Sequence, residues 1–320
     1  MQLVNSTPYP AMIFRGGIDE SRLFGAVIAR VTYDMVGQEL KVSSEQTWKV
    51  SPPPWECEYG PMDSDEVFYR GGVDIFAFGS ARPERGEATS MDVTVALGDS
   101  FKASIKVFGP RIWRKEARGL VPSPPYPFRE IPLTLAYAYG GKDLWDGLPV
   151  LFPKNPSGKG FYLEEANAIG KELPNIEDPM NLIRAWNDQP DPVGVTHCGM
   201  AFGPRIEQSV IFDEKTFELR EMKPTLFNAA FPSMVVSAAH EGERMRITGM
   251  SVAGPVEFIL PHSGLMVRLC FGQEINLVEP AIDQIGVEVD KKKVFITYRY
   301  PFRYVLVPLV KRSCELLAEG

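Results

Sequence analysis

Alternating hydrophobic and polar residues recur along the chain, and they predict β-strands because successive side chains of a strand point to opposite faces. Gly98-Asp99-Ser100 separates two such segments and supplies the residues of a hairpin turn. Toward the C-terminus the candidates follow one another at roughly ten-residue spacing, which is typical of a sandwich or a barrel. Strands are expected at residues 23–34, 39–50, 73–78, 91–97, 101–107, 244–252, 256–260, 265–271, 285–289, 294–300 and 302–310.

Helical patterns are rare. Leu182, Ile183 and Trp186 fall at helical spacing and predict a short helix over residues 180–186, and residues 311–319 predict a terminal helical turn. No segment repeats at a fixed period, and the strand–helix alternation of dinucleotide-binding enzymes is missing. We therefore predict a mainly β fold with antiparallel β-sandwich or barrel-like sheets, long irregular loops rich in Gly, Pro and aromatic residues, and few short helices.

The stretch from residue 107 to residue 179 departs from the strand pattern. It is dense in Gly and Pro, which neither continue a helix nor fit a central strand. Interleaved Phe, Tyr, Trp and Leu bring apolar area that offsets the cost of ordering the backbone. The sequence thus predicts a long ordered loop, and an ordered loop of this length in a compact domain indicates function.

Length and composition place the chain among soluble globular proteins. It has 320 residues, of which 44% are hydrophobic and 23% charged. We expect one large β-rich unit over residues 1–320, or two packed subdomains that comprise residues 1–179 and 180–320. Either arrangement is long enough to bury a substantial core.

The net charge of -7 and the pI of about 5.2 disfavour a polyanionic partner such as nucleic acid or an anionic membrane. Two basic clusters run against the overall charge. We interpret the cluster of Arg111, Arg114, Lys115 and Arg118 as a solvated rim beside Trp113, and the run at residues 291–293 as a charged hairpin turn.

The missing signal peptide and the spacing of the cysteines both predict a cytoplasmic protein without a membrane partner. The first ten residues lack the basic and apolar regions of a signal peptide, and no uncharged run is apolar enough to span a bilayer. The 4 cysteines are widely spaced and form no CxxC pair, as expected of reduced thiols. We expect no metal and no other cofactor.

Catalytic signatures are sparse. His197 lies beside Cys198, but adjacent residues seldom face each other as a catalytic pair must, so a buried or turn position is favoured. His240 and His262 lie in expected turns. The acidic run at residues 63–66 lacks the spacing of a calcium loop, and we interpret it as a solvated turn.

Polar residues within the Gly- and Pro-rich stretch are better explained as loop-fixing groups. Lys159 lies in a Gly-Lys-Gly segment that lacks the spacing of a phosphate loop, and we expect it to anchor on a carboxylate such as Glu177. Glu177 and Asp178 are neighbours in extended backbone and point to opposite faces, so they do not flank one scissile bond. Asn175, Glu177 and Asp178 are expected to bond the backbone of a proline-bounded turn.

An ordered set of short motifs carries a family resemblance. Gly109-x-Arg111-x-Trp113 is followed by Pro127-Phe128, Tyr139-Gly140-Gly141, Asn155-Pro156-x-Gly158-Lys159-Gly160 and Leu173-Pro174-Asn175-Ile176-Glu177. In the second half, Phe202-Gly203-Pro204-Arg205 and Phe227-Asn228-x-Ala230-x-Pro232 match more loosely. Together these motifs resemble the bacterial family known as domain of unknown function 2169, over roughly residues 73 to 300.

The resemblance implies a non-enzymatic adaptor or chaperone that helps to load a toxic effector onto the spike of a type VI secretion system. The expected partners are then proteins: the effector toxin and a spike or spike-tip protein. Within the stretch, the candidate contact residues are aromatic or arginine side chains, which dominate interface energies. They are Arg111, Trp113, Tyr126, Phe128 and Tyr139.

Three alternatives remain open at this stage. The same aromatic residues could plug the open end of a β-sandwich, because buried aromatics commonly serve packing. An enzyme could act on a small or carbohydrate-like substrate in a pocket around Asn155, Lys159 and Glu177. A structural component of the secretion assembly is the third alternative.

Overall fold

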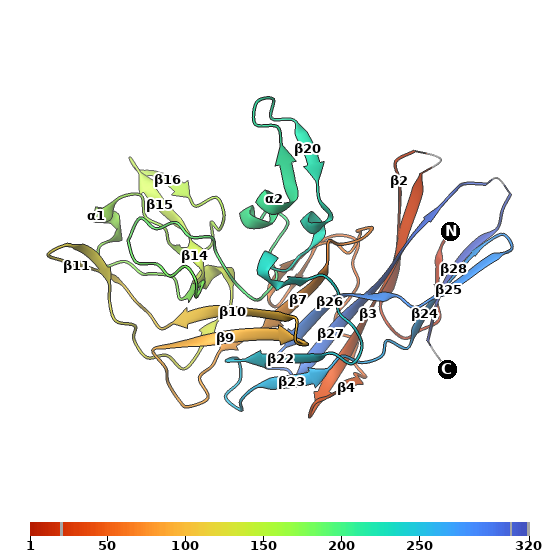
Figure 1. Ribbon diagram of the computed structural model, residues 1–320, viewed down its shortest axis with the longest axis horizontal. Coiled ribbons are helices and arrows are strands. Elements are labelled where there is room, and N and C mark those ends of the chain that lie inside the picture. The colour runs from red at the N-terminus through yellow and green to blue at the C-terminus, as the bar shows by residue number, and fades with distance from the viewer. Residues whose placement is uncertain (20–21, 308, 319–320) are drawn as a thin grey trace.

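The largest element of the fold is a mixed sheet of seven strands, seen at the centre of Figure 1. The computed structural model describes residues 1–19, 22–307 and 309–318. Neighbouring strands pair antiparallel except β7 and β26, which run parallel. In spatial order the strands are β2 (Ala11–Gly17), β3 (Leu23–Val36), β27 (Lys293–Tyr304), β26 (Ala281–Glu288), β7 (Val73–Phe78) and β21 (Val235–Val236), with β4 (Glu39–Val42) also pairing with β3.

A second, antiparallel sheet of five strands lies in front of the first in Figure 1. It contains the hairpin predicted around Gly98, whose φ of +55° is one that glycine adopts without strain. Its order is β18 (Ile176–Glu177), β10 (Phe101–Phe108), β9 (Ser90–Leu97), β22 (Arg244–Thr248) and β23 (Val256–Ile259). Two segments of the predicted loop region therefore enter this sheet, at the start of the stretch and near its end.

The two sheets share one hydrophobic core. Alternate residues of β3 (Val27, Ala29, Val31 and Tyr33) are at most 2% exposed and belong to the same buried cluster as residues of β9 and β22. The residues between them are equally buried, so β3 is covered on both faces, and the period of two places its polar buried side chains on the face opposite these four. The mainly β sandwich prediction is confirmed, and none of the sheets in the described residues closes into a barrel.

The two halves of the sequence are interleaved in both sheets. β27 lies between β3 and β26, and β22 lies beside β9. A division at residue 179 would therefore separate strands that are hydrogen-bonded neighbours.

A four-stranded sheet gathers the two ends of the chain at the right of Figure 1. Its order is β1 (Leu3–Asn5), β28 (Arg312–Ala318), β24 (Leu265–Phe271) and β25 (Glu274–Val278). The helical turn predicted for residues 311–319 is wrong, because Cys314 and Leu316 alternate with more exposed residues and β28 pairs with two strands. Glu319 lies outside the described residues. The strand predicted at residues 302–310 ends at Tyr304 as part of β27, and Pro308 also lies outside the description.

The second face of the seven-stranded sheet buries charges. Asp74 is 0% exposed, and its carboxylate accepts hydrogen bonds from Asn228 Nδ2 (2.9 Å), Gln284 Nε2 (3.0 Å) and Ala229 N (3.0 Å). Arg70 lies 3.6 Å away as an ion-pair partner. A buried carboxylate needs such donors because the desolvation of an unpaired charge costs several kcal/mol.

Asp65 belongs to the same buried layer. It is 2% exposed, accepts a 2.7 Å hydrogen bond from Arg30 Nη2, and caps Ser51 N at 2.9 Å. The prediction of a solvated turn at residues 63–66 is therefore wrong for this residue. The local sequence shows four polar residues, and the arginine that makes burial possible lies on a distant strand.

Short elements complete the fold, and many of the short strands pair into two-stranded sheets. The helix predicted at residues 180–186 is absent from this described segment, where Asp188 accepts hydrogen bonds from Arg184 N and Ala185 N instead. The short strands and helices are β5 (Trp55–Cys57), β6 (Gly60–Met62), β8 (Ser80–Ala81), β11 (Trp113–Glu116), β12 (Gly119–Pro122), β13 (Ile131–Pro132), β14 (Tyr139–Gly140), β15 (Lys142–Trp145), β16 (Leu148–Leu151), β17 (Lys159–Gly160), β19 (Val210–Phe212), β20 (Leu219–Met222), α1 (Glu165–Ala168), α2 (Gly203–Ser209) and 3-10 turns at Leu135–Tyr137, Pro224–Phe227 and Pro232–Met234.

Candidate protein-binding surface

Part of the Gly- and Pro-rich stretch folds around a hydrophobic cluster separate from the sandwich core. The rest of its buried hydrophobic residues, among them Phe128 and Ile176, belong to the sandwich core. We call residues 108–187 the loop module. In Figure 1 it forms the left-hand lobe, with β11, β14, β15, β16 and α1. The buried side chains of the separate cluster are Trp113, Leu120, Tyr139, Phe152, Phe161, Ala168, Leu173 and Ile183. The prediction that aromatic side chains hold this irregular backbone in place is confirmed.

A buried ion pair ties the two ends of the module together. Arg111 and Glu177 are 6% and 3% exposed, and Arg111 Nη2 donates to Glu177 Oε1. Arg111 also donates to Pro174 O at 2.8 Å, and its guanidinium lies 3.9 Å from the centroid of the Phe108 ring. Glu177 Oε2 accepts from Ile183 N at 2.8 Å. The prediction that Arg111 belongs to a solvated rim is therefore wrong, whereas its neighbours at 114, 115 and 118 are exposed.

Two buried asparagines also hold the backbone of the module. Asn155 is 2% exposed, and its Nδ2 donates to Leu135 O (2.9 Å) and Tyr139 O (3.0 Å). Asn175 is equally buried and donates from Nδ2 to Phe108 O at 2.8 Å. These are side-chain to backbone bonds of the loop-fixing kind.

Gly140 shows why this part of the backbone needs glycine. Its φ is +145°, and a Cβ at this position would come within 2.1 Å of Asn155 O. Only glycine allows so close an approach of the two backbone segments.

The aromatic candidates divide by exposure. Trp113, Phe128 and Tyr139 are 1%, 6% and 2% exposed, whereas Tyr126 is 62% exposed. Burial raises the pKa of the Tyr139 hydroxyl well above its usual range. Three of these side chains are therefore placed for packing, and Tyr126 is available to solvent.

Lys159 contributes to an open groove of about 800 Å³ beside Phe128 and Asn175. Its ammonium group lies 3.3 Å from Glu172 Oε2 and 4.9 Å from the centroid of the Tyr137 ring. Lys159 therefore anchors on a carboxylate as predicted, but Glu177 is the wrong partner, because that carboxylate faces Arg111. Asn155 and Glu177 do not line this groove, so the three side chains of the enzyme alternative do not converge in it.

The hairpin of β15 and β16 was missed by the sequence analysis. Asp146 and Gly147 have φ of 48° and 79°, as a type I′ turn requires, and an Asp-Gly pair between apolar residues is the signal that could have revealed it. Its large apolar side chains face solvent. Their exposures are Leu144 60%, Trp145 57%, Leu148 69% and Leu151 52%.

Asp143 fixes this hairpin to the module. Its Oδ2 accepts from Leu163 N at 2.7 Å and from Asn167 Nδ2 at 2.9 Å, and Oδ1 accepts from Leu144 N at 2.8 Å. Burial opposes ionisation of this carboxyl, but the hydrogen bonds outweigh burial and lower its pKa. The hairpin is thus held by a charged residue at its base while its apolar tip remains uncovered.

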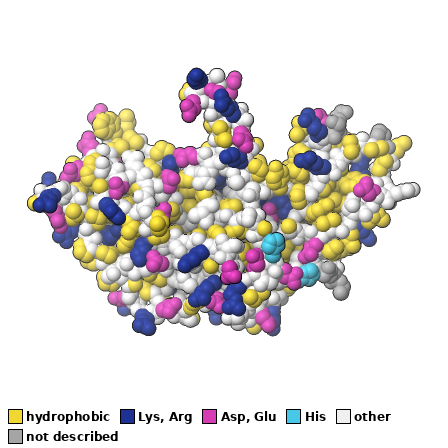
Figure 2. Space-filling view, viewed as in Figure 1, with side chains coloured by type: hydrophobic (Ala, Val, Ile, Leu, Met, Phe, Trp, Pro, Cys, Tyr) yellow, Lys and Arg dark blue, Asp and Glu magenta, His cyan; other side chains and the backbone are white. Residues whose placement is uncertain are grey.

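A second hairpin, β19 and β20, rises from α2 on the same side of the molecule (Figure 1). Phe212, Phe217 and Leu219 are 52%, 81% and 55% exposed. Lys154, just after β16, joins the two parts by bonding Glu207 of α2 at 2.8 Å. Figure 2 shows hydrophobic side chains in the upper-left knob, where Figure 1 places β15 and β16.

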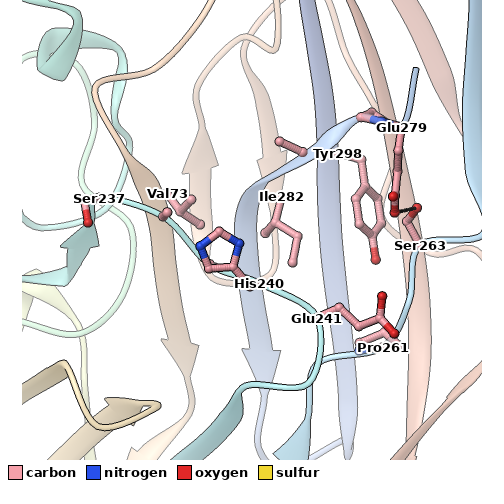
Figure 3. Close-up of a pocket in the computed structure, with 13 residues that line it drawn as sticks. Val73, Ser237, His240, Glu241, Pro261, Ser263, Glu279, Ile282 and Tyr298 are labelled. Atoms are coloured by element: carbon pink, nitrogen blue, oxygen red, sulfur yellow. Dashed lines mark hydrogen bonds between the residues drawn. The ribbon is translucent and has the colours of Figure 1, made fainter. Parts of the chain in front are cut away.

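The histidines lie elsewhere. A pocket of about 470 Å³ is lined by His240, Glu241 and Glu279 among others, and Figure 3 shows them, with Glu279 hydrogen-bonded to Ser263. His262 Nδ1 lies 2.9 Å from Glu241 Oε2 at its rim. This pocket shares no lining residue with the groove beside Lys159.

His197 and Cys198 are both buried, at 8% and 1% exposed. Burial raises the pKa of the Cys198 thiol to about 12, which opposes formation of the thiolate that a nucleophile needs. Burial likewise lowers the pKa of His197. The described residues contain no group of His, Cys, Asp and Glu arranged to hold a metal ion. Among the same residues, no helix is long and apolar enough to cross a membrane.

Fold and site define a class of protein: a β-sandwich with an attached module that has its own core, and two exposed apolar hairpins, of which the module carries one. The chain belongs to the family described as "Uncharacterized protein conserved in bacteria (DUF2169)", whose model matches residues 20–299. The resemblance carried by the sequence motifs is thereby confirmed. No curated protein matches the chain, and no solved structure does.

Proposed function

We propose that this protein is a non-enzymatic adaptor or chaperone that binds a type VI secretion effector and helps to load it onto the spike complex. The observation that carries the proposal is the pair of hairpins that rise on one side of the molecule (Figure 1) and whose large apolar side chains are exposed. The family resemblance supplies the secretion context. In this proposal the protein acts in the cytoplasm, before the effector leaves the cell.

Exposed aromatic side chains on rigid turns suit protein recognition. Trp145 and Phe217 are 57% and 81% exposed, and tryptophan is among the residues that dominate interface energies. Contiguous apolar patches are uncommon on monomeric proteins, because they invite association. A hairpin already ordered by its turn loses less conformational entropy on binding than a flexible loop.

The predicted site residues take a supporting role in this proposal. Four buried side chains hold the backbone of the module in place: Arg111, Asn155, Asn175 and Glu177. The hairpin that the module carries supplies the contact. Tyr126 adds an exposed aromatic ring at the edge of the same module.

The test is a pull-down from the native host with tagged wild-type protein and a Trp145→Ser/Leu148→Ser double variant, followed by mass spectrometry. We expect the wild type to retain a toxin and a spike protein. We expect the double variant to capture at least tenfold less toxin than the wild type. Its melting temperature should stay unchanged, because both substituted side chains are exposed.

Arg114→Ala is the matched control, since Arg114 lies in the same module and its side chain is 53% exposed. Capture of neither a toxin nor a spike protein by the wild type contradicts the proposal, and so does a double variant that retains both. A structural component of the assembly would instead remain with the spike in stoichiometric amounts after the toxin is released.

A further inference from the structure

The outer edge of β25 is open. β25 ends the four-stranded sheet, pairs with β24 on one side, and makes no backbone hydrogen bond on its other side to any residue that the structure describes. An edge strand presents a row of unpaired N–H and C=O groups that can pair with another chain. Figure 1 places this edge at the right of the molecule, away from the two hairpins.

β25 lacks the features that usually protect an edge. Its five residues contain no Pro and no Lys, and its register with β24 runs without a bulge. The other edges differ: β18 and β21 have two residues each, and on β23 Ile259 N donates to Gln38 O at 3.1 Å. β2, which ends the seven-stranded sheet, is longer, but it carries Arg15 and ends in Gly16-Gly17. β25 is therefore suited to accept a further strand.

The side chains of β25 add an apolar stripe to this open edge. Ile275 and Leu277 are 66% and 55% exposed and lie on the same, outward face of the sheet. In the register with β24 they are opposite Cys270 and Arg268. Arg268 is itself paired with Glu315 of β28, so the neighbouring charge is balanced.

The sequence of β25 is complementary to itself. If two copies pair antiparallel about Asn276, Ile275 of each copy lies opposite the second copy's Leu277, so two apolar pairs form on one face. Glu274 then lies opposite the second copy's Val278, and no like charges face each other. A strand with charges at symmetric positions would repel its own copy, whereas this one does not.

We propose that two copies of this chain associate through β25, which pairs antiparallel about a two-fold axis at Asn276 and joins the two four-stranded sheets into one. The occupant of the edge is a second copy because the pairing satisfies the backbone groups and the apolar stripe of both partners at once. A two-fold interface also closes on itself, so it yields a dimer and no open filament. This association is independent of the hairpins proposed to bind the effector.

Sedimentation velocity of the purified full chain, from about 1 to 100 μM, tests the association over a range that covers a weak interface. We expect a shift from monomer to dimer across this range for the wild type. Leu277→Lys is expected to weaken dimerisation at least tenfold, because an edge lysine opposes strand addition. Ile211→Lys, on the distant hairpin, is the matched control and should dimerise like the wild type.

Cross-linking provides a second measurement that does not depend on Leu277. In a Cys270→Ser background, Asn276→Cys places two thiols opposite each other at the two-fold axis, where directly opposed Cβ atoms lie about 4.5–5.5 Å apart. Oxidation should give a covalent dimer of the folded protein. A wild type that stays monomeric at 100 μM overturns the proposal, and so does a dimer that is neither weakened by Leu277→Lys nor cross-linked through residue 276.

Discussion

Removal of the Arg111 guanidinium is expected to destabilise the loop module strongly. Arg111→Met leaves Glu177, 3% exposed, with the hydrogen bond from Ile183 N but without its cationic partner. It also removes the bond to Pro174 O and the contact with the Phe108 ring. Breaking a buried ion pair by removing one partner typically costs about 3–5 kcal/mol, because an uncompensated charge remains buried.

The matched control is an arginine three residues away. Arg114 pairs with Glu116 at 3.3 Å, but the two side chains are 53% and 50% exposed. Exposed pairs contribute about 0–1 kcal/mol, so Arg114→Met should change the free energy of unfolding by no more than about 0.5 kcal/mol. The same substitution at two nearby positions thus isolates the effect of burial.

Urea unfolding followed by tryptophan fluorescence measures the stability difference, and hydrogen exchange localises it. We expect faster exchange in the module and native-like exchange in the sandwich, because the module has a core of its own. Glu177→Gln added to Arg111→Met should recover part of the loss by removing the stranded charge. If Arg111→Met lowers the free energy of unfolding by less than about 1 kcal/mol, similar to the control, the interpretation that Arg111 holds the module together is refuted.

The remaining predictions concern packing and pH. Trp113→Ala should lower the free energy of unfolding by about 3–5 kcal/mol, because the ring is 1% exposed. Tyr126→Ala should lower it by no more than about 0.5 kcal/mol, because that ring is 62% exposed, and equal losses would contradict this assignment. Burial lowers the pKa of His197, so the unfolded chain binds more protons as pH falls below about 6.5 and stability is lost there. His197→Gln should therefore show a smaller drop in melting temperature between about pH 7.5 and 5.5, and an unchanged drop would rule out His197 as the source.

The hairpin of β15 and β16 shows which part of the site could be predicted from the sequence. Asp146-Gly147 between apolar residues is a local signal, and its two positive φ values follow from residue type. What the local pattern leaves open is whether Trp145 and Leu148 pack inward or face solvent. The fold decides this, because no described element covers the hairpin.

The burial of Arg111, by contrast, could not be predicted from the sequence. Residues 111–118 look like a basic surface cluster, and three of the four basic residues are exposed as that pattern indicates. Arg111 is buried because Glu177, distant in sequence, pairs with it inside the same module, where the two residues are 6% and 3% exposed. Asp65 repeats the lesson, since Arg30 of β3 makes its burial possible.

The mainly β class, the hairpin at Gly98, the irregular backbone of the loop module and the family could all be predicted from the sequence. These follow from side-chain period, turn residues and short motifs, which act over a few residues. That the motif residues of the module mostly face its interior, and that the apolar hairpins face solvent, followed from the three-dimensional fold alone. Burial depends on which distant segments meet, and local patterns do not contain that information.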